Sequence, residues 1–261
     1  MSYYNDYSVL DKPDILQFTF HPRKEVRRGP HNSTDYFIPM GDEVSICCRF
    51  YVHSHSSPSI LFFHGNGEVA SDYDDIAPIY NQRGINLFVT DYRGYGLSGG
   101  TPTFTNMVGD ASNIFEAFLD ILRRENYTGD IFIMGRSLGS ICAIELAFHC
   151  QEQVKGLIIE SGLASILGLL THLGFATDFL DIKDNTFPNA TKMRSITLPT
   201  LLIHGEYDSF IPISEARELF KNAAAIRKQL IIINGANHNN IIAVDMERYF
   251  TAIEQFIIET E

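Results

Sequence analysis

Short apolar runs alternate with helical periodicity over most of the chain. Six runs rich in Ile, Leu, Val and Phe end on polar or glycine-rich residues: SILFFHG, NLFVTDY, DIFIMGR, GLIIESG, TLLIHGE and QLIIING. Between and after these runs, apolar spacing of three and four residues predicts helices over 72–82, 107–125, 138–150, 214–225 and 246–258. Such alternation is typical of a parallel sheet buried on both faces. We therefore predict an α/β fold with a mostly parallel sheet and helices on both faces.

The beginning of the chain has a different pattern. Residues 15–52 contain three candidate strands, ILQFTF, DYFIP and EVSICCRFYV, separated by turns with Pro and Gly. These runs predict antiparallel strands that precede the parallel part of the sheet.

One connection is longer than the others. Nearly forty residues separate Gly162 from Thr200, where a helix of about 10–15 residues would suffice. We expect one helix there and a small cap insertion at residues 163–190, within a single domain that spans residues 1–261.

Composition narrows the functional classes. The 261 residues carry 20 basic and 32 acidic side chains, a formal net charge of −12, which argues against nucleic-acid binding. The four cysteines form no CxxC pair, which indicates reduced thiols and a cytoplasmic location. We find no signal peptide, no membrane anchor and no apolar run of about 18 residues, and we expect a soluble protein. The pattern does not indicate an oligomeric state.

The motif G-x-S-x-G, which places a serine at a tight strand-to-helix turn, occurs twice. The match at residues 135–139 follows the run DIFIM directly and opens into SLGSICAIELAFHC, a strong helix-forming segment. The match at residues 96–100 is followed by Thr-Pro-Thr, and no helical pattern begins until about Asn106. We therefore predict Ser137 as a nucleophile and Ser98 as a loop residue. A plain N-cap role for Ser137 would leave both flanking glycines unexplained.

Residues 94–99 also match G-x-G-x-x-G after a strand, which suggests a dinucleotide-binding βαβ unit as an alternative. That unit needs a helix that starts on the glycines and an acidic residue about 20 residues later, at the end of the next strand. Here the helical pattern starts late and the next strand ends in Gly-Arg-Ser. An oxidoreductase is therefore the weaker interpretation.

A serine hydroxyl becomes an effective nucleophile when a histidine accepts its proton and a carboxylate holds that histidine. In this topology the chain order is serine, acid, histidine, and four of the nine histidines follow Ser137. His149 lies in the same predicted helix as the serine, His172 lies in the atypical segment, and His204 ends a strand, where we expect it to support the backbone. We predict His238, in the polar loop GANHNN after the last strand, as the general base.

For the carboxylate we predict Asp208, at the end of the strand that precedes the strand of His238. Glu206, two residues nearer the strand, and Glu160, at the end of the strand after the serine-bearing helix, are alternatives.

The oxyanion formed during acyl transfer needs two backbone donors. We predict the amide of Leu138, directly after the nucleophile, and the amide of Asn66 in the loop HGNG, with Gly67 as the alternative. His64 is expected to form a hydrogen bond within that loop. The alternating pair His53 and His55 has no third ligand at suitable spacing, so we predict no metal site.

The phrases FFHGNG, VTDYRGYGLSGGTPT, GRSLGS, IIESG, HGEYDSFIP and NHNN together resemble an α/β-hydrolase over nearly the whole chain from about residue 40. Within that superfamily they are similar to the serine hydrolases grouped with the yeast bud-emergence proteins and the membrane-anchored α/β-hydrolase-domain proteins. The resemblance implies the α/β-hydrolase fold, a triad of Ser137, Asp208 and His238, and no cofactor. Many of these relatives carry an N-terminal membrane anchor, which we do not find here.

The sequence therefore predicts a serine hydrolase that cleaves carboxylic esters or thioesters through an acyl-enzyme. Its predicted partner is a small-molecule acyl substrate of short to medium chain length. Apolar positions in residues 163–180 fit an acyl pocket and an ordinary amphipathic helix equally well. An aminopeptidase-like amide hydrolase and a non-catalytic binding protein of the same fold are the alternatives.

Overall fold

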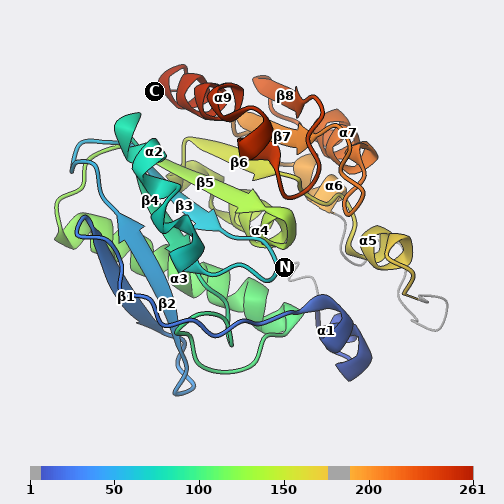
Figure 1. Cartoon of the computed structure of the whole chain (residues 1–261), viewed down its shortest axis with the longest axis horizontal. Helices are drawn as coiled ribbons and strands as arrows, with labels where there is room; N and C mark the ends of the chain where they lie inside the picture. Colours follow the sequence, from blue (N-terminus) through green and yellow to red (C-terminus); the bar gives the residue numbers. More distant parts are fainter. Residues whose placement is uncertain (1–6, 176–188, 261) are drawn as a thin grey trace.

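The computed structural model of the protein describes residues 7–175 and 189–260. These residues form an eight-stranded sheet with helices packed around it (Figure 1). The strands are β1 (Ser33–Pro39), β2 (Ser45–Tyr51), β3 (Ser59–Phe63), β4 (Asn86–Thr90), β5 (Ile131–Arg136), β6 (Gly156–Glu160), β7 (Thr200–Gly205) and β8 (Lys228–Ile233). Their order in the sheet is β1-β2-β4-β3-β5-β6-β7-β8. The pairs from β4 to β8 are parallel, whereas β2 pairs antiparallel with both β1 and β4. The predicted mostly parallel sheet with antiparallel N-terminal strands is confirmed.

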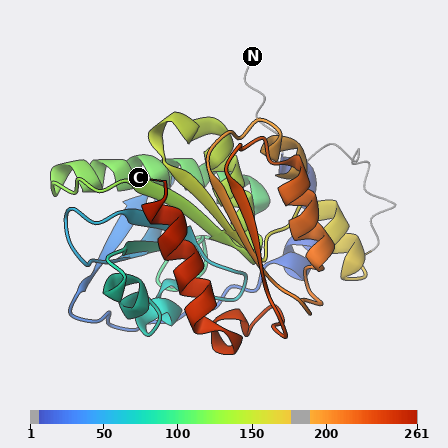
Figure 2. The ribbon, with the colours of Figure 1, turned by 90° about the horizontal axis from the view of Figure 1, so that it is seen from above.

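Helices cover both faces of this sheet (Figure 2). They are α1 (Pro13–Thr19), α2 (Ala77–Gln82), α3 (Phe104–Arg124), α4 (Ser140–Cys150), α5 (Ile166–His172), α6 (Asn189–Met193), α7 (Ile213–Asn222), α8 (Ile241–Val244) and α9 (Met246–Ile258). Alternate residues of β3 explain why both faces need a cover. Leu61 and Phe63 join the buried cluster under α3 and α4, while Ile60 and Phe62 join the cluster under α2 and α9.

The N-terminal segment corrects one sequence prediction. DYFIP and EVSICCRFYV form most of β1 and β2, but the predicted strand ILQFTF lies mainly in the helix α1. A short apolar run fits a strand or a helix by periodicity alone. Pro13 at the start of α1 and Asp14 in its first turn favour a helix, since proline suits the first turn and a carboxylate complements the helix N-terminus.

The predicted cap insertion at residues 163–190 lies partly outside the described residues, which omit 176–188. The described part contains α5, which begins after the N-cap Ser165, whose side chain accepts a hydrogen bond from the amide of Gly168 at 3.1 Å. The rings of Phe18 and Phe175 lie 5.1 Å apart, so the segment after α5 packs beside α1.

Candidate active site

The turn between β5 and α4 holds Ser137 in a strained backbone conformation. The φ angle of Ser137 is +52°, a region that side chains other than glycine rarely adopt. Ser137 follows the last residue of β5 and begins the short 3-10 helix Ser137–Gly139, and α4 begins at Ser140. Strand, turn and helix therefore occur in the order that the sequence predicts for a nucleophile.

The glycines on either side of Ser137 are required by close backbone packing. A Cβ atom on Gly139 would lie 2.1 Å from the carbonyl oxygen of Phe63 on β3. A Cβ atom on Gly135 would lie 2.5 Å from the carbonyl oxygen of Gly139. The tight turn thus explains both glycines, which an ordinary N-cap would not need.

We expect Gly139→Ala to lower the free energy of unfolding by about 1–3 kcal/mol, because the added methyl group meets backbone atoms that cannot rotate away. Gly109→Ala in α3 is the matched control, since a Cβ atom there meets nothing within 4 Å. That control should gain about 0.5–1 kcal/mol, because glycine is a poor helix residue. Urea denaturation measures both changes, and equal midpoints for the two variants would contradict the packing argument.

Ser137, His238 and Asp208 form a hydrogen-bonded row. Nε2 of His238 lies 3.0 Å from Oγ of Ser137, and Nδ1 of His238 lies 2.7 Å from Oδ2 of Asp208. The three residues follow β5, β8 and β7, whose carboxyl ends meet at one edge of the sheet. The structure therefore brings together three side chains that lie up to 101 residues apart in sequence.

The turn after β7 orients Asp208. Its Oδ1 accepts hydrogen bonds from the amides of Phe210 at 3.0 Å and Ile211 at 2.8 Å. Burial alone would raise the pKa of Asp208, but the bond to His238 and the Ile211 amide lower it below its ordinary value. Asp208 is therefore held as a carboxylate that accepts a hydrogen bond from Nδ1 of His238.

The other candidates for these roles have different partners. The carboxylate of Glu206 accepts a hydrogen bond from the amide of Gly235 at 2.9 Å. Glu160 accepts bonds from Arg136 at 3.0 Å and from the Tyr249 hydroxyl at 2.7 Å. In the described part of the chain, the ring nitrogens of His238 bond to Ser137 and Asp208 instead.

Two other histidines, His204 and His64, and the serine of the second motif have structural contacts. Nε2 of His204 lies 2.8 Å from the carbonyl of Ile211, which supports the Asp208 turn as expected of a backbone-supporting residue. Nδ1 of His64 lies 2.8 Å from the carbonyl of Gly65, within the loop as predicted. The hydroxyl of Ser98 is buried and accepts a hydrogen bond from the amide of Cys47 at 2.9 Å.

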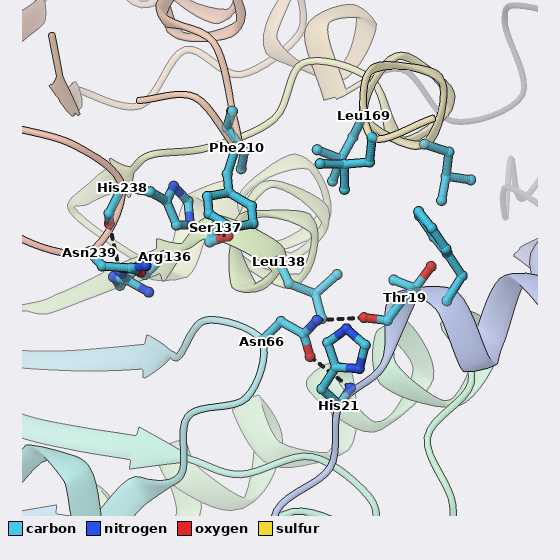
Figure 3. Close-up of a pocket in the computed structure, with 14 residues that line it drawn as sticks. Thr19, His21, Asn66, Arg136, Ser137, Leu138, Leu169, Phe210, His238 and Asn239 are labelled. Atoms are coloured by element: carbon cyan, nitrogen blue, oxygen red, sulfur yellow. Dashed lines mark hydrogen bonds between the residues drawn. The ribbon is translucent and has the colours of Figure 1, made fainter. Parts of the chain in front are cut away.

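A cavity of about 260 Å³ opens beside Ser137 (Figure 3). One wall is apolar, and its residues come from three segments. They are Phe18 of α1, Leu169 and Leu170 of α5 with Leu173 directly after this helix, and Phe210 and Ile211 of the turn that carries Asp208. Other side chains of the 163–175 segment, such as Leu163, are buried in the core. The segment therefore has one side toward the cavity and another side in the core.

Asn66 and Leu138, the predicted oxyanion donors, both line this cavity. The Asn66 side chain is turned toward the N-terminal segment (Figure 3). Its Oδ1 accepts bonds from the amide of His21 at 3.0 Å and from the Tyr95 hydroxyl at 2.7 Å, and its Nδ2 donates to the carbonyl of Thr19. Sequence reasoning missed this support, because its partners lie 29 to 47 residues away and form no motif with the HGNG loop.

Arg136, directly before the nucleophile, carries a charge beside the site. Burial would lower the pKa of Arg136, but the carboxylates of Glu68 and Glu160 raise it above its ordinary value, so the guanidinium stays charged. Within the described residues, no group of three or more His, Cys, Asp or Glu side chains is placed to share a metal ion. Across residues 7–175 and 189–260, no helix is both long and apolar enough to cross a membrane.

Comparison with known proteins adds to this geometry. A model of the family described as serine aminopeptidase, S33, matches residues 54–190 and 165–243. The chain is 31% identical over 222 residues to the alpha/beta hydrolase domain-containing protein 17B of Homo sapiens, which covers 81% of this chain and 70% of that protein.

Solved structures show the same fold at lower identity. An esterase of Pyrococcus furiosus superposes with a TM-score of 0.74 at 17% identity, over 92% of this chain and 97% of the esterase. A soluble variant of the monoglyceride lipase from Saccharomyces cerevisiae, in complex with a substrate analogue, superposes with a TM-score of 0.69 at 14% identity, over 87% and 95% of the two chains.

Proposed function

Since this chain belongs to the α/β-hydrolase superfamily, we propose that it is a serine hydrolase that cleaves carboxylic esters or thioesters. The observation that carries the proposal is the hydrogen-bonded row of Ser137, His238 and Asp208 at the edge of an apolar cavity. A nucleophile, a base and an orienting carboxylate in this relation are the parts that acyl transfer requires.

In this mechanism Oγ of Ser137 attacks the acyl carbonyl while Nε2 of His238 takes its proton. Asp208 holds the imidazole so that Nε2 faces the serine, and it stabilises the charge that the ring acquires. The backbone amides of Leu138 and Asn66 donate to the oxyanion. His238 then returns the proton to the leaving group. In the second half of the reaction His238 deprotonates a water molecule, which attacks the acyl-enzyme, and the same proton passes to Oγ of Ser137 as the acid leaves.

The aminopeptidase-like alternative is less well supported by the cavity. A peptide amino terminus is a cation, and its binding calls for a carboxylate close to the nucleophile. Among the described residues that line the cavity there is no Asp or Glu. The apolar wall instead fits an uncharged acyl chain.

We further propose a reducing compartment such as the cytoplasm as the place of action. All four cysteines are free thiols, and Cys47, Cys48 and Cys142 are buried. Burial raises the pKa of the Cys47 thiol to about 12, so this thiol stays protonated and unreactive.

Acyl-chain length gives the test of the proposal. Across p-nitrophenyl esters from acetate to palmitate, we expect the highest kcat/KM for short to medium chains and a decline once the chain outgrows the cavity. Leu169→Trp should move that decline to shorter chains, because the indole occupies the apolar wall. Ile226→Trp adds the same ring at a fully exposed position and is the control.

Two outcomes would contradict the proposal. Rates that rise up to palmitate and do not respond to Leu169→Trp would show that the acyl chain binds elsewhere. No turnover of any ester, together with no labelling by a fluorophosphonate, would favour the non-catalytic binding protein.

A further inference from the structure

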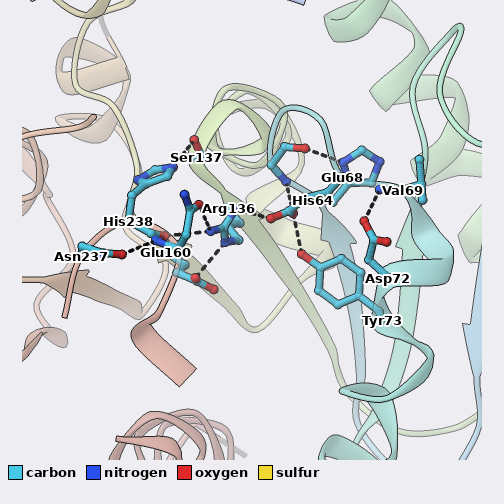
Figure 4. Close-up of polar contacts among 12 residues, drawn as sticks. His64, Glu68, Val69, Asp72, Tyr73, Arg136, Ser137, Glu160, Asn237 and His238 are labelled. Atoms are coloured by element: carbon cyan, nitrogen blue, oxygen red, sulfur yellow. Dashed lines mark hydrogen bonds and ion pairs between the residues drawn. The ribbon is translucent and has the colours of Figure 1, made fainter. Parts of the chain in front are cut away.

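Arg136 connects three segments that surround the nucleophile (Figure 4). It is the last residue of β5, and its side chain is only 12% exposed. Nε donates to Glu160 at 3.0 Å, Nη1 donates to Glu68, and Nη2 donates to the carbonyl oxygen of His238 at 2.8 Å. Each nitrogen of one planar group thus bonds to a different segment of the chain.

The contact with His238 acts on the backbone of the proposed general base. Asp208 fixes the imidazole ring from one side, through Nδ1. Arg136 fixes the peptide of the same residue, and its Nη2 also lies 3.4 Å from Oδ1 of Asn239 in the same loop. The loop after β8 is therefore tied to the residue that precedes the nucleophile.

The contact with Glu68 extends to the other side of the nucleophile. Oε2 of Glu68 accepts hydrogen bonds from the amide of Gly65 at 2.7 Å and from the Tyr73 hydroxyl at 2.8 Å. Gly65 directly precedes Asn66, whose amide is the proposed oxyanion donor. The bond between Arg136 and Glu68 therefore holds the oxyanion loop at a fixed distance from the turn that carries Ser137.

The contact with Glu160 anchors the group to the sheet and to α9. Glu160 ends β6, is 3% exposed, and accepts a second bond from the hydroxyl of Tyr249. A lysine could not replace the arginine in this role, because its single ammonium lacks the planar fork that reaches three directions at once. A neutral side chain would leave two carboxylates, at Glu68 and Glu160, without their cation.

From these contacts we infer that Arg136 is a positioning residue, which sets the places of the His238 loop and of the Asn66 loop around Ser137. The inference rests on the proposed function of Ser137. It goes beyond that function because it assigns a role to Arg136, which acts on the reaction through the loops of His238 and Asn66.

Arg136→Lys and Glu68→Gln test this inference, because each keeps most of the side-chain volume and removes part of the network. We expect kcat for p-nitrophenyl acetate to fall about 10- to 100-fold in both, the size of effect that a shift of about 1 Å in a reacting group produces. KM should change much less, since neither change alters the apolar wall. Arg123→Lys, on the exposed side of α3, is the matched control and should keep the wild-type rate.

Chemical rescue separates positioning from a merely structural ion pair. Guanidinium at a concentration that leaves the wild type folded should restore part of the kcat that Arg136→Ala loses, whereas sodium chloride at equal ionic strength should not. Thermal denaturation of every variant shows whether it is folded at the assay temperature.

The outcomes distinguish this inference from the proposed function. Folded Arg136→Lys and Glu68→Gln with kcat within about twofold of the wild type would overturn the inference alone, because a misplaced base or oxyanion loop must slow the reaction. If a variant regains the wild-type kcat at a lower temperature at which it is folded, its defect is one of stability, and this outcome would also overturn the inference. Ser137→Ala with wild-type activity would overturn the proposed function and the inference with it.

Discussion

Ser137→Ala is expected to lower kcat for ester hydrolysis by about 10⁵- to 10⁶-fold, the effect seen when a nucleophile that works with its base is removed. The alanine keeps the cavity and the apolar wall but offers no oxygen to the acyl carbon. His238 then has no hydroxyl to deprotonate within hydrogen-bond distance. Turnover of a p-nitrophenyl ester and labelling by a fluorophosphonate both report the loss.

Ser98→Ala is the control for Ser137→Ala, because Ser98 lies in the other match to the motif G-x-S-x-G. Ser98 is fully buried, and its hydroxyl accepts the Cys47 amide. Ser98→Ala leaves that amide without its acceptor, which should cost about 1–3 kcal/mol of stability and leave labelling intact. Labelling that survives Ser137→Ala and is lost in Ser98→Ala would reverse the assignment.

The contrast between the two serines shows what a sequence can predict. Residues around Ser137 form a strand, a turn and a helix because local patterns dictate each of them, and the glycines leave room for the turn. The six apolar runs give β3 to β8 for a similar reason, since strands inside the sheet, such as β3, β4 and β6, are buried on both faces and must be apolar throughout. Asp208 and His238 approach Ser137 because parallel strands deliver their carboxyl ends to one edge.

Other parts of the site depend on contacts that carry no local signal. Arg136 bonds to partners 24, 68 and 102 residues away. The periodicity of the sequence does not distinguish this Arg, or its Glu partners, from any other Arg or Glu in the chain. The same holds for the N-terminal segment. Its run ILQFTF suits a strand as well as a helix, and its bonds to Asn66 exist only once the chain has folded.

Asp208→Asn is expected to lower kcat by about 10⁴-fold while the fold persists. The reason lies in the tautomer of His238. The Asp208 carboxylate accepts a hydrogen bond from Nδ1–H, which keeps the ring proton on Nδ1 and leaves Nε2 free to accept the proton of Ser137. An asparagine amide can instead donate to Nδ1, which places the ring proton on Nε2, where it blocks the base. Glu206→Gln, two residues away, is the control and should keep the wild-type rate, because Glu206 contacts Gly235 instead.

The same variant tests the charge on Asp208 through stability. Because the pKa of Asp208 is lowered in the folded state, its ionised form stabilises the protein at pH values above the unfolded pKa of about 3.9, and this contribution is lost as the pH falls through the folded value. The difference in unfolding free energy between the wild type and Asp208→Asn should therefore shrink as the pH falls below about 4. Urea denaturation of both proteins between neutral pH and pH 3 measures it. A difference that stayed constant down to pH 3 would mean that Asp208 gains no stabilisation from ionising beside His238, and the proposed role of its carboxylate would lose its physical basis.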